Sequence, residues 1–396
     1  MKHKKIHIAL AVAVCLAVPA AAQQGIDAVL DSVARNNKTL KARQGYWEAQ
    51  KLLYRTGNTP YDPTVSYDFM RGSPQDVAGN QTDITVTQAF DFPSVYGRKA
   101  AVADEHDRQA DFGISTARQE ILLDAKLVCL ELVYRNRLQA QLAERVAKTE
   151  TYRDDFREKL EKGFGNVLDV NKASLQLIEL NRQQRENAAA IKRLNEQLAA
   201  LNGGKTIAFT DTVYPAEEPV PEFGLLIAEM ENRDTARLYL QQQAVVSGKQ
   251  VEVARALALP RFEVGYHYQA ILGQTFSGVR LGMSIPLWEK RNRVRQRKAE
   301  QLAAEVRVDE HRVAHHAEMR QLHTTHLNTS TTLDEYRSVL DGMQGVALLD
   351  KALALGEMTT IEYFLETGYF YQAMDNYLEV EMDYHRALAE LYKYRL

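Results

Sequence analysis

The sequence predicts an α+β fold that is mainly helical and is built from two copies of one structural unit. Pro93 and Pro286 each follow a short strand of alternating apolar and polar residues, and they lie 193 residues apart. Gly163 and Gly356 each interrupt a long helical stretch and are separated by the same 193 residues. Because only 10 prolines and 21 glycines occur in 396 residues, the helices between these landmarks should be long.

Each half is expected to have the same order of elements. The first half is predicted to contain a helix at 26–56, strands at 63–71 and 84–92, and helices at 98–162 and 167–201. The second half is predicted to contain a helix at 225–257, strands at 260–272 and 279–285, and helices at 289–355 and 360–396. A proline-containing linker, 203–224, separates a first repeat (23–202) from a second repeat (225–396).

Apolar residues recur at coiled-coil spacing in the long helices. Examples are Ile121, Ala125, Val128 and Leu132 in one helix and Leu194, Leu198 and Leu201 in the next. Such spacing predicts antiparallel helices that pack lengthwise against each other. At 1.5 Å per residue, the helix at 98–162 would be about 100 Å long, which suits a rod or a tunnel better than a globular domain.

The N-terminus has the three parts of an export signal in their usual order. Residues 1–5 are mostly basic, residues 6–18 are apolar but too few to span a bilayer, and residues 20–22 form an Ala-Ala-Ala cleavage site. We therefore predict a signal peptide over residues 1–22 and an exported mature chain. Lipid attachment at Cys15 is not expected, because the residue before it is bulky. Removal of the signal leaves Cys129 as the single cysteine, so no intramolecular disulfide can form.

The charge balance and the lack of catalytic motifs exclude several classes of function. The formal net charge is −3, and no basic tract is interleaved with aromatic residues, so a nucleic-acid partner is not expected. The sequence contains no nucleophile motif, phosphate-binding loop or plausible pair of catalytic carboxylates. Neither enzymatic activity nor a cofactor is therefore predicted.

The alternation in the four strands allows two interpretations. In the strand at 260–272, Phe262, Val264 and Tyr266 lie on one face, and Glu263 and His267 lie on the other. Such a strand can belong to a soluble sheet with one face on a core, which composition alone favours. It can also belong to a transmembrane barrel, whose strands need about 9–11 residues. The export signal and the scarcity of other strands favour the barrel.

Four strands are too few to close a barrel in a membrane, since about eight is the smallest number known. An open sheet in lipid would leave unpaired backbone groups at its edges, each costing several kcal/mol. The barrel hypothesis therefore requires several copies of the chain. Three copies would supply 12 strands, so a homotrimer follows from this hypothesis.

Several short motifs occur in one order within the duplicated frame. They are Asn-Asn-Lys-Thr-Leu at 36–40 with its echo at 232–237, Ala-Leu-Ala-Leu-Pro at 256–260 before Val-Gly-Tyr at 264–266, Ile-Pro-Leu-Trp at 285–288, and the glycine turn at 163 followed by Leu-Asp-Val at 168–170. With these motifs the chain resembles the TolC family of outer-membrane efflux proteins over nearly its whole mature length. It departs from the family pattern in lacking the proline usual after the asparagine, and in reading Ile-Glu-Tyr-Phe at 361–364.

The resemblance implies a homotrimer with a 12-stranded barrel in outer-membrane lipid and a periplasmic α-barrel of coiled-coil helices. It implies a passive duct that works with a periplasmic adaptor and an inner-membrane pump of the RND or ABC type. A heavy-metal cation efflux channel and a type I protein secretion duct of the same fold are alternatives. A soluble periplasmic adaptor or structural coiled-coil protein is a further alternative.

The glycine turns are the first candidate functional residues. Gly163, Gly165 and Gly356 can adopt the conformations that end a helix. The resemblance implies that these turns form the periplasmic tip, where an adaptor docks.

Three acidic residues near these turns are candidates for a ring at a narrow aperture. Asp169 and Glu362 are equivalent by the 193-residue offset, and Glu366 follows one turn later. Threefold symmetry would bring like charges together and attract cations. The alternative is that Asp169 and Glu362 stabilise a helix start, where the macrodipole favours an acid.

Two further groups carry weaker signals. Trp288, Lys290 and Arg291 follow the last strand and are candidates for the membrane interface. The alternative for Trp288 is a core position, and the alternative for the basic residues is a solvated helix face. His311 and His315 are one helical turn apart, a spacing that can hold a metal. Because no cysteine or HExxH motif accompanies them, the polar face of a long helix is the favoured interpretation.

Overall fold

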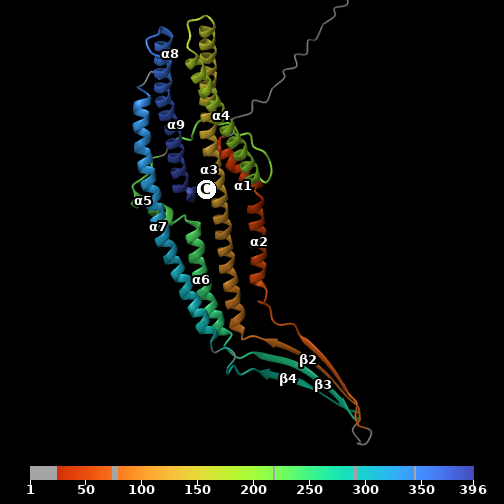
Figure 1. Cartoon of the computed structure of the whole chain (residues 1–396). Helices are drawn as coiled ribbons and strands as arrows, with labels where there is room; N and C mark the ends of the chain where they lie inside the picture. The colour runs from red at the N-terminus through yellow and green to blue at the C-terminus, as the bar shows by residue number, and fades with distance from the viewer. Residues whose placement is uncertain (1–24, 74–78, 217–218, 289, 291, 343–344) are drawn as a thin grey trace, which may run out of the picture.

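The computed structural model describes residues 25–73, 79–216, 219–288, 290, 292–342 and 345–396 (Figure 1). The predicted signal peptide, Cys15 and Arg291 lie outside the described residues. The molecule is elongated, with a sheet at one end and long helices extending away from it (Figure 1). None of the described helices is both long and apolar enough to span a membrane.

The two halves of the chain follow the same order of elements through their strands, and the second half then contains one more helix and a short 3₁₀ helix. The first half consists of α1 (Ile26–Asn36), α2 (Lys38–Arg55), β1 (Thr64–Met70), β2 (Gln81–Phe90), α3 (Pro93–Glu161) and α4 (Val167–Leu201). The second half consists of α5 (Phe223–Glu231), α6 (Thr235–Ala256), β3 (Phe262–Ile271), β4 (Gln274–Met283), α7 (Arg293–Leu340), α8 (Val346–Leu355), α9 (Thr360–Leu391) and a short 3₁₀ helix (Lys393–Arg395).

Three helices predicted as continuous are broken, and two of the breaks have the same cause. The helix predicted at 26–56 divides at Asn37, whose side chain accepts a hydrogen bond from the Leu40 amide at 2.7 Å and so begins a new helix. The helix predicted at 225–257 divides before Asp234, which begins α6 in the same way. An N-cap residue needs a non-helical backbone, so each cap interrupts the helix. The helix predicted at 289–355 divides into α7 and α8.

The coiled-coil seams predicted from the sequence form the main core. Ala125, Val128 and Leu132 of α3 are buried together with Leu194 and Leu198 of α4. Ile121 and Leu201 pack partly buried against the same core. Cys129 is fully buried in this core, and burial raises the pKa of its thiol to about 12. The cysteine is therefore an inert core residue.

The sheet is antiparallel, with the strand order β1-β2-β3-β4, and the β2–β3 pairing joins the two halves of the chain. A buried carboxylate holds the base of the sheet to the helices. Asp91, at the end of β2, lies 3.3 Å from the Lys99 ammonium of α3 and 3.2 Å from the Arg261 guanidinium before β3. The start of α3 and the start of β3 are therefore fixed at one point.

Candidate functional site

One face of the sheet is apolar across all four strands. Val65 pairs with Val86, Val86 with Tyr266, and Tyr266 with Val279, so these four side chains form one row. The neighbouring rows add more apolar side chains: Tyr67, Ile84, Tyr268, Val264, Leu281, Phe262 and Met283. Val279 and Leu281 are each 76% exposed. A contiguous exposed apolar surface of this kind marks a site of contact with a membrane or another protein.

The opposite face of the sheet is mainly polar, although Met70, Ile271 and Phe276 also lie on it. Ser66 pairs with Thr85, and Thr85 pairs with His267. The Thr85 hydroxyl and the Nδ1 atom of His267 form a hydrogen bond of 2.7 Å. Asp83 and Gln269 form the next row. The sheet therefore has one face suited to lipid and one suited to water.

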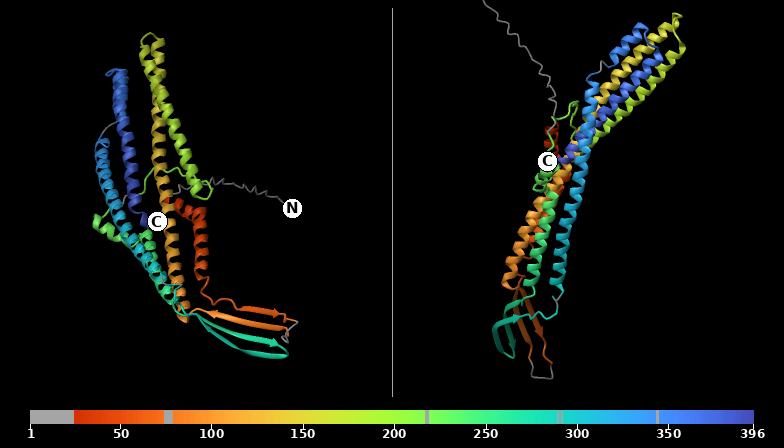
Figure 2. Two further views of the ribbon diagram at one scale, coloured as in Figure 1. Left: turned by 60° about the horizontal axis from the view of Figure 1, so that its bottom comes forward. Right: turned by 90° about the vertical axis from the view of Figure 1, so that its left-hand side faces the viewer.

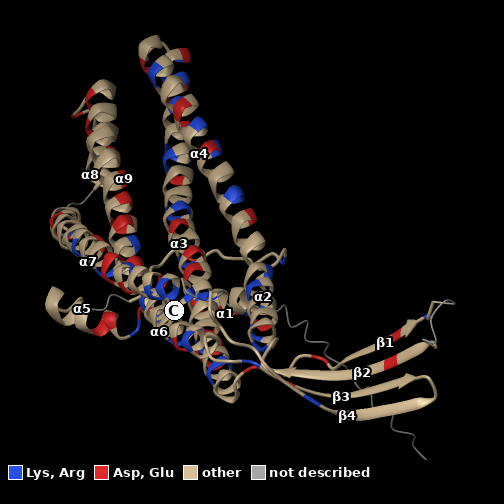
Figure 3. Cartoon of the chain, turned by 90° about the horizontal axis from the view of Figure 1, so that it is seen from below, with Lys and Arg blue, Asp and Glu red and all other residues tan. Residues whose placement is uncertain are grey.

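No described helix packs across either face of this sheet (Figures 1 and 2). Figure 3 shows that charged residues are spread along the helices and that the strands carry few. Among the described residues, neither face of the sheet therefore lies on a core formed by this chain.

The backbone groups at the outer edge of β4 point away from the sheet. Ile271 and Gln274 flank a two-residue turn, Leu272 and Gly273, in which both φ angles are positive. At the other end of the hairpin, the Ser284 amide donates to the Arg261 carbonyl at 2.9 Å. Because bonding alternates along an antiparallel strand, odd-numbered residues of β4 direct their N–H and C=O groups outward. In the described part of the chain, no other strand pairs with the outer edge of β4 or with the outer edge of β1.

The two glycine turns lie at the same end of the molecule, farthest from the sheet (Figures 1 and 2). Gly163 ends α3 with φ +81°, and the amides of Gly163 and Phe164 donate to the carbonyls of Leu160 and Lys159. Gly356 ends α8 with φ +73° and the same pair of hydrogen bonds. Both turns are Schellman motifs, which satisfy carbonyls that a helix end would leave unpaired.

Gly165 is needed for a different reason. A Cβ atom there would overlap the backbone nitrogen of Leu160, so the chain can make this close approach only with glycine. The equivalent position in the second turn is Met358. The turns therefore share their first glycine but not their path back into the next helix.

Alanine substitutions should distinguish these two roles. We expect Gly165→Ala to destabilise the α3–α4 turn more than Gly356→Ala destabilises the α8–α9 turn. The Cβ atom at position 165 would overlap backbone atoms, whereas alanine at position 356 would only have to adopt a positive φ, at a cost of about 1 kcal/mol. Hydrogen exchange of amides in the turns would measure both. Gly368→Ala in α9 is the control, since it meets open space in a helix and should stabilise. Equal exchange in all three variants would contradict this account.

The candidate aperture acids differ in their surroundings. Glu362 forms a capping box with Thr359: its Oε2 atom accepts from the Thr359 amide at 2.8 Å, and its own amide donates to the Thr359 hydroxyl at 3.2 Å. The hydrogen bond from the Thr359 amide lowers the pKa of Glu362. Asp169 lies half-exposed in the first turn of α4. Glu366 is exposed beside a 990 Å³ groove between α7, α8 and α9.

Two polar clusters that the sequence did not reveal join α3 to the helices α8 and α9. Asp350 of α8 accepts hydrogen bonds from the hydroxyls of Tyr152 of α3, at 2.8 Å, and Tyr363 of α9, at 2.7 Å. Burial, followed by the hydrogen bonds with Tyr152 and Asp350, raises the pKa of Tyr363. Farther from the tip, Arg145 makes a bidentate ion pair with Asp375 of α9, at 2.9 and 2.6 Å. No local sequence pattern marks these contacts, since their partners lie in different helices.

The candidate interface residues lie between β4 and α7. Trp288 is 82% exposed. Lys290 donates to the carbonyl of Leu257, so its ammonium is engaged at the end of α6. The predicted basic helix start is present, and the first turn of α7 contains no acidic residue.

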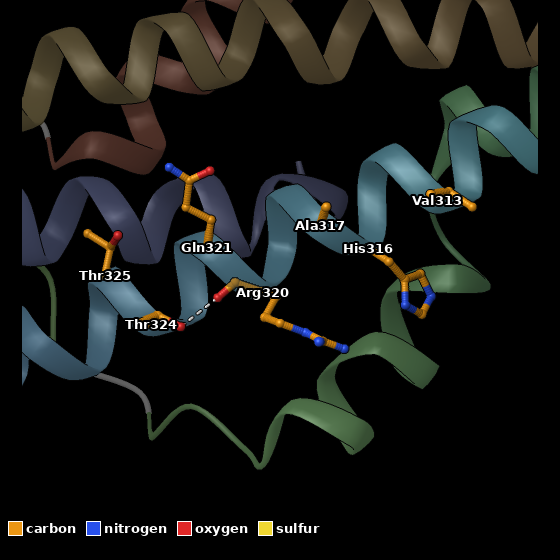
Figure 4. Close-up of a pocket in the computed structure, with 7 residues that line it drawn as sticks. All are labelled: Val313, His316, Ala317, Arg320, Gln321, Thr324 and Thr325. Atoms are coloured by element: carbon orange, nitrogen blue, oxygen red, sulfur yellow. Dashed lines mark hydrogen bonds between the residues drawn. The ribbon is translucent and has the colours of Figure 1, made fainter.

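Three histidines of α7, His311, His315 and His316, are partly buried and face carboxylates of the α5–α6 region. His311 and His315 turn toward Asp234, and their rings lie parallel with centroids 5.5 Å apart. His316 instead lines a separate shallow groove along α7 (Figure 4). Its Nε2 atom lies 3.0 Å from a carboxylate oxygen of Glu231. The carboxylate partners were missed because they lie in another element.

No family model and no curated protein matches this sequence. Solved structures do match over nearly the whole chain. The chain is similar to the CmeC outer-membrane channel of Campylobacter jejuni, with a TM-score of 0.73, 14% identity, and coverage of 93% of this chain and 85% of that one. It is similar to the outer-membrane channel OprN, with a TM-score of 0.76, 17% identity, and coverage of 93% and 89%.

The outer membrane protein VceC of Vibrio cholerae also matches, with a TM-score of 0.72, 13% identity, and coverage of 92% of this chain and 94% of that one. The shared architecture is mainly helical with one four-stranded antiparallel sheet. The chain therefore has the fold of the TolC-type outer-membrane channels, as its sequence motifs predicted.

Proposed function

We propose that this chain is one subunit of a homotrimeric outer-membrane channel whose three sheets close into a 12-stranded barrel. The observation that carries the proposal is the sheet itself. It exposes one contiguous apolar face, covers neither face with a helix among the described residues, and leaves both outer edges unpaired. Closure with two further copies satisfies the edges, and lipid covers the apolar face.

The helices would then form a tunnel across the periplasm. α3 contains 69 residues and would be about 100 Å long at 1.5 Å per residue. The channel acts as a passive duct without catalysis of its own, and an inner-membrane pump drives transport through a periplasmic adaptor. The paired tip turns, Gly163 with Gly165 and Gly356, are the proposed adaptor-docking region because they lie at the end opposite the barrel.

The shared order of two helices, two strands and a long helical hairpin supports an internal duplication, with a first repeat at 23–202, a linker at 203–224 and a second repeat at 225–396. The cargo is set by the pump, so efflux of small molecules, of heavy-metal cations or of secreted proteins would use the same duct. A soluble adaptor is disfavoured because its sheet would expose the apolar face to water.

Cell fractionation followed by mass measurement tests the proposal. We expect the mature chain in the outer-membrane fraction, soluble only in detergent, with the protein mass of three chains after correction for bound detergent. Recovery of a monomer from the periplasm without detergent would overturn the proposal.

We also predict that the paired acids of the tip influence ion selectivity. Replacing both Asp169 and Glu362 by alanine should reduce the preference for cations in planar bilayers, because a ring of carboxylates is lost. Thr359→Ala is the control, since it breaks the capping box and leaves the Glu362 carboxylate in place. If Thr359→Ala changes the ion selectivity as much as the double variant does, Glu362 acts through the helix cap and not through its charge.

A further inference from the structure

Three potential metal ligands from two separate elements meet beside the start of α6. One carboxylate oxygen of Asp234 lies 2.9 Å from Nε2 of His311 and 3.8 Å from Nε2 of His315. The three ligand atoms lie within 4.8 Å of one another. Ligand atoms around a tetrahedral Zn²⁺ ion, each about 2.0–2.2 Å from the metal, would lie slightly more than 3 Å apart. Small side-chain rotations would therefore bring the three groups to this geometry.

The carboxylate of Asp234 is held in place by the helix that it begins. Its Oδ1 atom accepts hydrogen bonds from the amides of Ala236 and Arg237, at 3.0 and 3.2 Å, which leaves Oδ2 directed at the histidines. The orientation of the side chain is thus already fixed by the backbone of α6.

The Nε2 atom of His315 is buried and has no hydrogen-bond partner. This is unusual, because a buried polar atom is nearly always satisfied. Its other ring nitrogen, Nδ1, lies 3.7 Å from Glu318, the kind of carboxylate that orients a metal-bound imidazole. Nε2 is therefore the ring nitrogen that faces Asp234 and His311.

A cavity of about 490 Å³ opens beside the three groups and gives room for further ligands. Glu318 and Glu390 line this cavity with them. Burial raises the pKa of Glu390, and the charge of Arg386 opposes this rise more than the charge of Glu318 adds to it.

We propose that Asp234, His311 and His315 bind one divalent transition-metal ion of the Zn²⁺ type, with water in the open coordination position. Two imidazole nitrogens with one carboxylate suit Zn²⁺, Co²⁺ or Ni²⁺ and not Ca²⁺ or Mg²⁺, which prefer oxygen ligands. The ion would cross-link the start of α6 to α7. This is a site within one subunit, so it does not depend on what passes through the proposed channel.

The neighbouring pair His316 and Glu231 provides a matched contrast. It is also a histidine of α7 facing a carboxylate of α5, at 3.0 Å, but among the described residues no third ligand group joins it. Both partners are also more exposed than those of the proposed site. A two-group contact of this kind is an ordinary surface ion pair.

The first half of the chain indicates a suitable variant for Asp234. Asn37, which begins α2, shows that an asparagine side chain caps a helix in this architecture. Asp234→Asn should therefore keep the cap of α6 while it removes the anionic ligand. His315→Gln and His311→Gln each remove one imidazole from a partly exposed position on α7, with no effect on a helix cap.

The purified mature protein, stripped with a chelator and kept in its native assembly, would be titrated with Zn²⁺ by calorimetry and with Co²⁺ by visible absorption. We expect one ion per chain and the intense absorption bands of four-coordinate Co²⁺. Each of the three variants should weaken binding at least about tenfold, since loss of even an outer-sphere partner costs 10–100-fold. His316→Gln should bind as the wild type does.

Two results would overturn the proposal. One is that the wild-type protein takes up no Zn²⁺ at micromolar concentration. The other is that His316→Gln weakens binding as much as His315→Gln, which would indicate diffuse surface binding. Circular dichroism of each variant verifies the fold, and His315→Gln alone decides the question if Asp234→Asn does not fold.

Discussion

Replacing Leu281 by proline is expected to prevent assembly of the trimer while the single chain still folds. Leu281 lies on β4, and its N–H group points to the outer edge of the sheet, away from its partner Val264 in β3. Proline removes this donor and leaves the β3–β4 pairing intact. In a closed barrel the neighbouring subunit's carbonyl would lose its partner in lipid, at a cost of several kcal/mol at each of three interfaces.

The same substitution has little effect in a soluble sheet, where proline is accepted at edges and even protects them. The experiment therefore separates the two interpretations of the strands directly. Leu281→Ala is the control, because it shortens the side chain and keeps the N–H group. Native mass measurement in detergent would report the assembly, and a stable trimer of the proline variant would contradict the closed barrel.

Asp375→Ala is expected to destabilise each chain by about 3 kcal/mol, because it leaves the guanidinium of Arg145 buried without its counter-ion. The Arg145 side chain is only 5% exposed, whereas that of Asp375 is 39% exposed, so the variant leaves the more buried of the two charges without its partner. The Tyr371 ring, 4.3 Å from the guanidinium carbon, and the Gln141 side chain compensate only in part. Thermal unfolding of the assembled protein would measure the loss.

Two further variants test this explanation. Removing the cation as well, in Arg145→Met with Asp375→Ala, should recover most of the stability because no buried charge remains. Asp383→Ala breaks an exposed pair with Arg386 on the same helix and should cost at most about 0.5 kcal/mol, as surface pairs do. Equal losses from Asp375→Ala and Asp383→Ala would show that the α3–α9 ion pair contributes little.

The accuracy of the sequence predictions depended on how local the signal was. The helix predicted at 167–201 has the bounds of α4, because an N-cap asparagine before it and a glycine after it mark its ends. The breaks at Asn37 and Asp234 were missed although both residues are common N-caps. Their signal was weaker than the helical periodicity on either side.

Among the functional residues too, those with a local sequence signal were predicted and those with distant partners were not. The turn glycines were found because a positive φ at Gly163 and Gly356 is a property of one residue and its neighbours. The partner of His311 was not found, because Asp234 lies 77 residues away along the chain. The partner of Arg145 lies 230 residues away.

The sequence by itself determined the order of the strands and long helical stretches, the alternation of the strands and the positions of the glycine turns, since these follow from backbone preferences and periodicities over a few residues. Only the tertiary structure decided that the apolar face of the sheet is left uncovered, that Asp234 meets two histidines, and that one buried arginine ties the two hairpins together. These outcomes depend on the packing of helices and strands that lie far apart in the sequence. The role of a carboxylate or an apolar face is set by the elements that pack against it, or by their absence.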